Sequence, residues 1–219
     1  MPILCYEITG AATPNARSTT GAEDGQLSAV LKCDHEAAQS QVYAELVANR
    51  LALFLGIPVL VGVPARASAS DARLRFAALR AAEVGLDVYD FTDDDRHDPD
   101  NDPDDAPPLP DGMYRHAGHA RAMTLLAQKY PKETADLAVF DLWIGNEDRA
   151  LNFKADLGAT DRGVMFALDQ GSSLLACRPT VDQSLEWLAR DDFPSFHPFQ
   201  KLVNARYCGA MVERIMSMP

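Results

Sequence analysis

Apolar residues in the first part of the chain follow the spacing of short strands around one long helix. The pattern predicts a helix over residues 36–55 and strands over residues 2–8, 26–33, 56–64 and 73–79. On the helix, Val42, Leu46 and Leu53 fall on one stripe, and Gly56 ends the run. The last strand has an alternative, because residues 73–83 also fit a helix.

The later part of the chain has the spacing of helices instead. The pattern predicts helices over residues 113–130, 131–143, 181–188 and 199–216, and a short strand over residues 164–168. Pro131 suits a first helical turn, and the helix that it starts directs Leu137, Phe140 and Trp143 toward the core. Together the two parts predict an α+β fold.

Two polar segments interrupt these elements. Residues 9–25 are rich in small and hydroxylated residues and almost free of large apolar ones, which predicts a mobile loop. In residues 93–105, eight of thirteen positions are Asp, and prolines follow, which predicts a solvated connection. Calcium binding is the alternative, but no Gly holds the sixth position of a calcium loop and no closing Glu follows. We therefore expect an N-terminal unit over 1–92, an acidic, proline-rich linker over 93–111 and a helical unit over 112–219.

Carboxylates and an amide follow the helix that Pro131 starts. Asp148 and Asn152 lie on a polar loop after that helix, and a short apolar strand then leads to Asp169, just ahead of Gly171. Phosphoryl transfer needs one carboxylate to orient or deprotonate the attacking hydroxyl, and an Asn and a second Asp to hold Mg²⁺ against a triphosphate. The alternative is a plain polar loop before a β-hairpin, since Asp, Asn and Gly are ordinary turn residues.

A lysine and a glutamate form a second candidate pair. Glu45 lies on the apolar stripe of the predicted helix, where a carboxylate is costly to bury without a partner. Lys32 ends the preceding strand and could be that partner. Kinases use such a pair to hold the α- and β-phosphates of ATP. A surface lysine that extends its charge into water explains Lys32 as well.

Both loops resemble those of a known family. The motifs are Gly145-Asn146-x-Asp148-Arg149-x-x-Asn152 and Leu168-Asp169-x-Gly171. They are similar to the catalytic and metal-binding loops of HipA-like kinases, which share their pattern with the phosphatidylinositol 3- and 4-kinases. The resemblance covers residues 27–175 and implies a two-lobed protein-kinase-like fold. Its N-lobe would be small and β-rich with one long helix, and its reduced C-lobe mostly helical.

The resemblance implies an enzyme that uses ATP and Mg²⁺ to phosphorylate a hydroxyl, typically a Ser or Thr of a protein. The implied roles are catalysis for Asp148, phosphate binding for Lys32 with Glu45, adenine contact for the backbone of Ala77 and Leu79, and metal binding for Asn152 and Asp169. The implied partners are ATP, a protein substrate, and an antitoxin or other regulatory protein. Ser18, Thr19 and Thr20 are candidates for regulatory phosphorylation, because the phosphate-covering loop of the family often carries such serines.

One spacing departs from the family. The metal-binding Asn of the family follows the catalytic Asp by five residues, whereas Asn152 follows Asp148 by four. This shorter spacing and the lack of a GxGxxG loop favour a pseudokinase, or a nucleotide-binding regulatory module without turnover. An enzyme that transfers AMP with the same groups, and a lipid kinase, are further alternatives.

Charge, apolar runs and cysteine spacing limit the binding partners and the cellular compartment that we expect. A formal net charge of −12 at pH 7 repels nucleic-acid phosphates and anionic membranes, so we expect neither as a partner, and a phosphoinositide substrate is disfavoured. No apolar run approaches the ~18 residues that span a bilayer, and the start of the chain shows no export signal. The cysteines are scattered without CxxC spacing, which predicts buried free thiols in a reducing cytoplasm.

Overall fold

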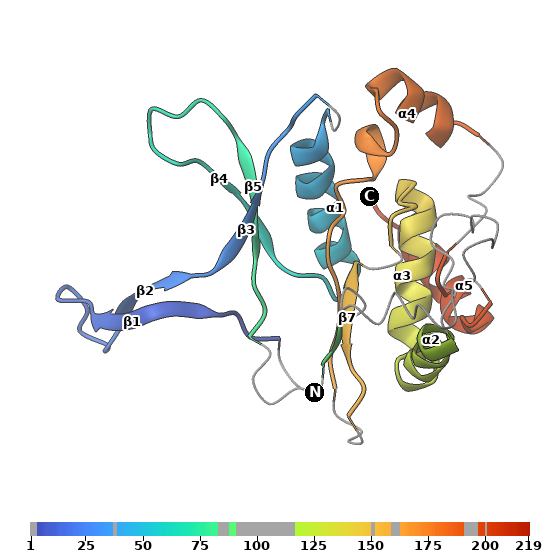
Figure 1. Ribbon diagram of the computed structural model, residues 1–219, viewed down its shortest axis with the longest axis horizontal. Helices are drawn as coiled ribbons and strands as arrows, with labels where there is room; N and C mark the ends of the chain where they lie inside the picture. The colour runs from blue at the N-terminus through green and yellow to red at the C-terminus, as the bar shows by residue number, and fades with distance from the viewer. Residues whose placement is uncertain are drawn as a thin grey trace, which may run out of the picture.

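The computed structural model shows an α+β protein. The described residues are 4–36, 39–82, 88–90, 117–149, 152–158, 163–190, 197–199 and 201–219. The acidic linker predicted over residues 93–111 lies outside them. In Figure 1 the strands of the N-terminal part lie on one side and the helices of the C-terminal part on the other, with α1 (Gln41–Leu55) between them.

The N-terminal strands form a hairpin and a small sheet. The hairpin consists of β1 (Ile8–Pro14) and β2 (Glu23–Leu27), and the 3-stranded antiparallel sheet consists of β3 (Ala29–Lys32), β5 (Arg75–Leu79) and β4 (Gly62–Ala65), in that order. In its register, Ala77 lies opposite both Leu31 and Val63. The predicted strand ending at residue 79 is therefore confirmed, and its helical alternative is wrong.

The hairpin corrects two predictions. The sequence predicts a strand over residues 2–8 and a mobile loop over residues 9–25. In the structure most of that segment belongs to β1 and β2, which pair with each other. Every residue of both strands is exposed, so burial does not hold the hairpin together. Backbone pairing and polar bonds at the tip do so instead, among them the N–H of Ala22 donating to Ser18 Oγ (2.9 Å). A pattern of apolar positions carries no signal for such a hairpin.

Helix α1 brings polar side chains into the interior. It begins at Gln41, later than predicted, and ends at Gly56, whose φ of 72° is left-handed as a terminating glycine allows. Its buried face includes Ala44, Glu45, Ala48, Asn49 and Ala52. Leu46 and Leu53 are only half-buried, so the predicted leucine stripe is wrong in part. The small alanines let the helix pack closely against the rest of the protein.

The C-terminal part combines helices with a second small sheet. Its described elements are α2 (Ala117–Lys129), α3 (Pro131–Ile144), α4 (Val181–Leu188), α5 (Ala205–Met216), the 3₁₀ turn Leu174–Ala176, and the sheet of β6 (Val88–Asp90), β7 (Phe153–Asp156) and β8 (Met165–Ala167). The predicted start of α3 and both bounds of α4 are confirmed, whereas α5 starts later than residue 199. Leu137 and Phe140 are buried but Trp143 is 41% exposed, because Ile144 completes the buried stripe in its place.

The core lies among α1, α2, α3, α5 and the strands β7 and β8. Leu126, Phe140, Phe153 and Phe199 are fully buried there. The segment after α1 runs beside β8, where the N–H of Ala167 donates to the carbonyl of Pro58 (2.9 Å). This contact ties the chain that leads into β4 to the C-terminal part.

No helix within the described ranges is long and apolar enough to cross a membrane. The cysteines are free thiols, as predicted. Only Cys177 is buried, whereas Cys5 is exposed and Cys33 and Cys208 are partly buried, so the prediction of burial holds for one of them.

Candidate functional site

Three charged side chains from distant parts of the sequence meet at one point. Lys32 Nζ lies 2.5 Å from Glu45 Oε1 and 2.5 Å from Asp169 Oδ2. Lys32 ends β3, Glu45 lies on α1, and Asp169 follows β8. The Glu45 side chain is fully buried, whereas those of Lys32 and Asp169 are 17% and 34% exposed. The predicted contact of Lys32 with Glu45 is therefore present, and Lys32 is not a plain surface lysine.

Backbone groups fix both carboxylates of this cluster. Glu45 Oε2 accepts the N–H of Gln170 (3.1 Å), and Asp169 Oδ1 accepts the N–H of Gly171 (3.0 Å). Asp169 has a φ of 40°, a conformation that residues with side chains rarely adopt. A Cβ at Gly171 would lie 2.8 Å from Gln41 Nε2, so a glycine fits this tight turn. The turn directs the Asp169 carboxylate back toward β3.

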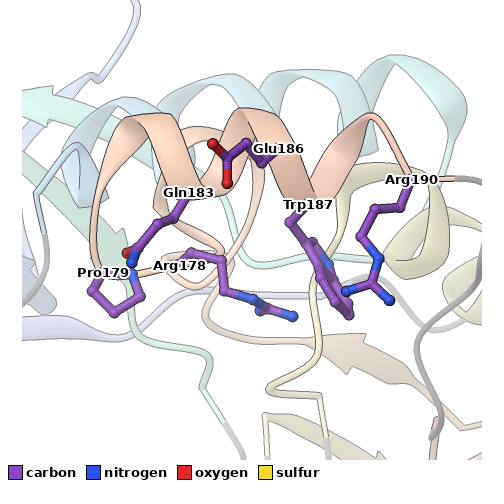
Figure 2. Close-up of a pocket in the computed structure, with 6 residues that line it drawn as sticks. All are labelled: Arg178, Pro179, Gln183, Glu186, Trp187 and Arg190. Atoms are coloured by element: carbon purple, nitrogen blue, oxygen red, sulfur yellow. The ribbon is translucent and has the colours of Figure 1, made fainter.

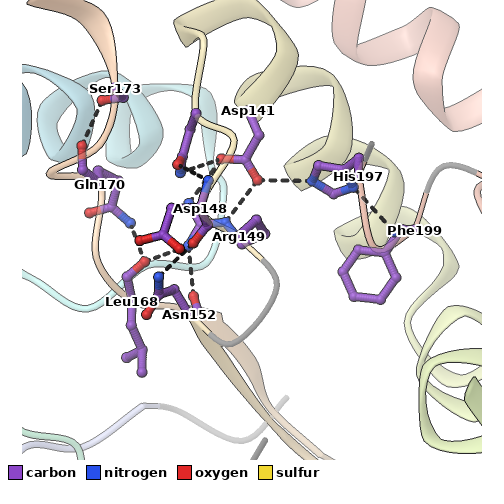
Figure 3. Close-up of polar contacts among 10 residues, drawn as sticks. Asp141, Asp148, Arg149, Asn152, Leu168, Gln170, Ser173, His197 and Phe199 are labelled. Atoms are coloured by element: carbon purple, nitrogen blue, oxygen red, sulfur yellow. Dashed lines mark hydrogen bonds and ion pairs between the residues drawn. The ribbon is translucent and has the colours of Figure 1, made fainter. Parts of the chain in front are cut away.

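A second group of polar residues holds the loop after α3 (Figure 3). The chain leaves the helix through Gly145, with a φ of 70°. The Asp141 carboxylate accepts hydrogen bonds from Asn146 Nδ2 (3.1 Å) and from Arg149 Nε (2.8 Å) and Nη2 (2.9 Å). Asn146 Oδ1 in turn accepts the N–H of Asp148 (3.1 Å). Asp148 therefore lies on a loop that is fixed on both flanks to one buried carboxylate.

Arg149 also joins this loop to the turn that carries Asp169. Its side chain is fully buried, and its Nη1 donates to the carbonyl oxygens of Asn152 (2.6 Å) and Leu168. The N–H of Leu168 donates to the same Asn152 carbonyl (2.8 Å). One guanidinium thus sets the positions of Asn152 and Asp169 relative to each other.

His197 completes the surroundings of Asp141. Its Nε2 lies 3.1 Å from Asp141 Oδ2, and its Nδ1 lies 3.2 Å from the backbone nitrogen of Phe199. Because the N–H of Phe199 can only donate, Nδ1 is the acceptor of that hydrogen bond. Nε2 therefore carries the hydrogen and donates it in a hydrogen bond to Asp141. Burial disfavours a charged Asp141, but Arg149 and His197 outweigh it and hold the pKa of Asp141 below its usual range.

The sequence alone assigns no role to Asp141, Arg149 or His197. A signal exists for Asp141, because it shares a helix face with the buried Leu137 and Ile144. A carboxylate on an apolar face needs a partner, by the same argument that pairs a lysine with the glutamate of α1. No comparable pattern surrounds His197, whose role follows from the folded structure.

The carboxyl groups of the site differ in their pKa values. Burial raises the pKa of Asp148, and the negative charge of Asp169 raises it further. Burial acts on Asp169 in the same direction, but its ion pair with Lys32 outweighs it and lowers the pKa of Asp169. Burial raises the pKa of Glu45 in spite of Lys32. Asp169 therefore ionises more readily than the neighbouring Asp148, a difference that is common at sites of proton transfer.

Asn152 and Asp169 could hold a divalent metal ion. Asn152 Nδ2 donates to the carbonyl of Asp148 (2.5 Å), which leaves the amide oxygen as a donor atom for a metal. Amide and carboxylate oxygens suit Mg²⁺, which takes its other ligands from substrate phosphates and water. Among the described residues, no three His, Cys, Asp or Glu side chains gather as a metal site. The donor set therefore fits Mg²⁺ bound together with a phosphate better than a metal enclosed by protein.

A cavity of about 450 Å³ adjoins the cluster. It is lined by Glu7, Val30, Leu60, Arg80, Ala81, Ala82, Lys154, Phe166 and Leu168. Val30 precedes Lys32 by two residues on β3, so the two share a face of the strand. Leu168 directly precedes Asp169. The cavity therefore lies next to the charged cluster.

The backbone of Ala77 and Leu79 is used within the sheet. Their strand, β5, lies between β3 and β4, and the N–H of Leu79 donates to the carbonyl of Val61 (3.0 Å). The chain reaches the cavity after the strand, at residues 80–82. No backbone hydrogen bond of Ala81 occurs within the described part of the chain. Arg80 and Ala82 also use backbone groups in bonds to Ser28, Glu7 and Cys5, so Ala81 is the lining residue best suited to offer backbone contacts to a ligand in the cavity. The adenine contact predicted for Ala77 and Leu79 stays a prediction.

Gly145→Ala is expected to strain the loop that carries Asp148. The φ of 70° disfavours a side chain, and an added Cβ would lie 2.8 Å from Leu188 Cδ2. We expect the free energy of unfolding to fall by about 1–2 kcal/mol, and the melting temperature by about 2–8 °C. Gly209→Ala is the matched control, because it lies in α5 with nothing within 4 Å of its added Cβ. Equal losses in thermal unfolding of the two variants would contradict the strain at Gly145.

Comparison with known proteins identifies no family. A scan against protein-family models gives no match, and a search of curated proteins finds no significant match. The likeness to HipA-like kinases therefore rests on the loop motifs, and the chemistry of the site has to be argued from its geometry.

Proposed function

We propose that this protein is an ATP- and Mg²⁺-dependent phosphotransferase of the HipA-like type that acts on a hydroxyl group. The proposal is carried by one observation: Lys32 joins Glu45 and Asp169 beside a cavity. Asp148 is close enough for the charge of Asp169 to raise its pKa. Kinases use this set of groups, with the lysine and glutamate in one lobe and two acidic groups in the other. Strands β1–β5 and α1 would form the smaller lobe of a two-lobed kinase-like fold.

The cavity is suited to the base and ribose of a nucleotide. Val30 and Leu60 supply apolar surface from the N-terminal part, and Phe166 and Leu168 supply it from β8 and the turn after it. Apolar walls with a few polar groups at the edge are usual for such ligands. The backbone of Ala81 could offer that edge a donor and an acceptor. A nucleotide held in this way would extend its phosphates toward the charged cluster.

Lys32 would change partners when a nucleotide binds. Its bond to Glu45 would persist, since Glu45 is fully buried and fixed by the N–H of Gln170. Phosphate oxygens would replace Asp169 at Lys32, and Asp169 would be released to hold the metal with Asn152. When bound, Mg²⁺ would offset the negative charge of the triphosphate.

Asp148 would orient the acceptor hydroxyl and accept its proton. Asp148 keeps part of its surface exposed to solvent, so an acceptor can reach it. Its raised pKa brings it closer to neutral pH, where a proton acceptor works best. Asn146 and Arg149 hold the loop before any substrate arrives, so little reorganisation is needed during transfer.

A Ser or Thr hydroxyl of a protein is the acceptor that we propose. The net charge of −12 disfavours phosphoinositide headgroups at an anionic membrane. A nucleotide-binding module without turnover is the second candidate. It is favoured by the spacing of Asn152 from Asp148, which is one residue shorter than in the family. Incubation with Mg²⁺ and ATP labelled separately at the α- and γ-phosphates would distinguish a kinase (γ label transferred) from AMP transfer (α label) and from the module (neither).

Mg²⁺–ATP is expected to raise the melting temperature clearly, and ATP without the metal only weakly. At about 100 times the dissociation constant, a ligand stabilises the native state by about 2.7 kcal/mol, or about 5–10 °C for a chain of this size. Lys32→Met should lose this shift, measured against its own melting temperature without ligand. Lys201→Met, at an exposed position, is the control. Equal shifts with and without Mg²⁺ would exclude Asn152 and Asp169 as metal ligands, and a full shift in Lys32→Met would exclude Lys32 as a phosphate contact.

A further inference from the structure

An open pocket of about 280 Å³ lies on α4 (Figure 2). One of its residues, Arg178, bonds to Glu147 in the loop that carries Asp148. It is lined by Arg178, Pro179, Gln183, Glu186, Trp187 and Arg190. The cavity of about 450 Å³ beside the charged cluster shares none of these residues. Both arginines point toward the indole ring of Trp187, a residue in the last turn of α4.

The Arg178 side chain is held by three groups. Its guanidinium carbon lies 3.7 Å from the centre of the Trp187 ring. Its Nη2 donates to Glu147 Oε2 (2.8 Å), and its Nη1 donates to the carbonyl of Cys177 (2.6 Å). The contact with the ring and the bond to the carbonyl restrain the guanidinium beside Glu147. The ion pair with Glu147 is therefore well defined, although its side chains are 26% and 34% exposed.

Glu147 belongs to the part of the loop that Asp141 does not hold. Asn146 and Arg149 bond to Asp141 on either side of it, so Glu147 and Asp148 form the crest between two fixed points. Within the described residues, the Glu147 side chain forms its hydrogen bond and ion pair with Arg178. The direction of the crest thus depends on a residue outside the loop.

We propose that Arg178 is a positioning residue, which fixes Glu147 and thereby aims the Asp148 carboxylate at the acceptor. The catalytic part of this inference rests on the proposed function. Arg178 lies on the chain that continues from Asp169 toward α4, so its bond to Glu147 links the metal-binding turn back to the catalytic loop. Arg149 makes the corresponding link on the other flank. The loop is thereby attached on both sides to the segment that would hold the metal.

A purely structural role predicts a different result. A partly exposed ion pair contributes little to folding stability. Misplacement of a catalytic group, in contrast, slows the chemical step strongly while leaving nucleotide binding unchanged. The effect of Arg178 should therefore appear in kcat, and not in the melting temperature or in KM for ATP.

The test compares Arg178→Met with Arg190→Met. Arg190 stacks on the same ring, 4.4 Å from its centre, but Glu147 pairs with Arg178. Turnover is measured as transfer of γ-labelled phosphate from Mg²⁺–ATP to the protein's own hydroxyls or to water. We expect Arg178→Met to lower kcat about tenfold or more with KM for ATP unchanged, and Arg190→Met to match the wild type. Arg178→Lys should restore part of kcat, and so should Arg178→Glu combined with Glu147→Arg.

Hydrogen exchange at the Asp148 amide supplies a measurement that needs no turnover. This N–H donates to Asn146 Oδ1 (3.1 Å), so a loosened crest should exchange faster in Arg178→Met than in Arg190→Met. If the wild type transfers no phosphate to itself or to water and a substrate search gives no product, the proposed function fails, and faster exchange would still support positioning by Arg178. Unchanged exchange, or unchanged kcat in an active enzyme, overturns the inference.

Discussion

Asp148→Asn is expected to abolish phosphoryl transfer and to leave Mg²⁺–ATP binding intact. The amide keeps the shape of the side chain but cannot accept a proton from the acceptor, and a positioned general base contributes a factor of about 10²–10⁴. Binding should survive, because the nucleotide would be held through Lys32 and Asp169 rather than through Asp148. Mass spectrometry after incubation with Mg²⁺–ATP measures phosphate on the chain itself, including the hydroxyls at residues 18–20, without knowledge of the substrate.

Asp182→Asn is the matched control, because it makes the same chemical change at an exposed position of α4. It should be phosphorylated like the wild type. Equal phosphorylation of wild type and Asp148→Asn would assign the chemistry to another group. Bound Mg²⁺–ATP with no phosphate on the wild type, and no product in a substrate search, would favour the module without turnover.

The pH dependence of turnover checks the same residue independently. Burial and the charge of Asp169 raise the pKa of Asp148, so the carboxyl stays protonated to a higher pH than an ordinary aspartate, at about 4. A proton acceptor must be ionised, so kcat/KM, which reports the free enzyme, should rise with pH through this raised pKa and level off above it. This rise should be missing in Asp148→Asn. A wild-type rate that is flat from pH 4 upward would contradict the assignment of Asp148 as proton acceptor.

Arg149→Met is expected to lower the free energy of unfolding by about 3–5 kcal/mol. Arg149 and Asp141 are both fully buried, and removal of the guanidinium would leave the Asp141 carboxylate charged and without its strongest partner. The carbonyls of Asn152 and Leu168 would also lose a donor. Urea denaturation measures the loss. Arg206→Met, at an exposed position of α5, should change the free energy by less than about 0.5 kcal/mol.

Two further measurements test this account of the ion pair. Asp141→Asn combined with Arg149→Met should recover part of the stability, because no charge is then left buried. The pKa of Asp141 is lowered in the folded protein, so its contribution is complete above the unfolded value of about 4 and is lost as the pH falls toward the lowered value. The wild type should therefore lose more stability in acid than the double variant. Parallel pH profiles of the two would contradict a charged Asp141.

Helix ends and one buried carboxylate were predictable from the sequence. Pro131 and Gly56 mark helix ends by conformational preferences that act locally, whatever the rest of the chain does. The contact of Lys32 with Glu45 was predictable for another reason. A carboxylate on a buried helix face has few acceptable partners, and the preceding strand offered one.

The features that escaped prediction depend on contacts between distant residues. Asp141 and His197 are separated by 56 positions, and no local pattern links them. The exposed hairpin of β1 and β2 forms without apolar burial, so hydrophobic periodicity does not show it. The backbone at Ala81, rather than that of Ala77 or Leu79, adjoins the cavity, because the position of β5 in its sheet is fixed by pairing with two other strands.

The cluster and the neighbouring Asp148 together have one lysine for three carboxyl groups. Lys32 contacts Glu45 and Asp169 directly and influences Asp148, while the charge of Arg149 is taken up by Asp141. When these carboxyl groups are ionised, Lys32 offsets only one of their charges, and an excess of negative charge disfavours free polyphosphates and favours divalent cations. A nucleotide complexed with a cation carries less negative charge than the free nucleotide and enters against a smaller repulsion. The protein would thus discriminate between two charge states of the same nucleotide, without any contact to its base.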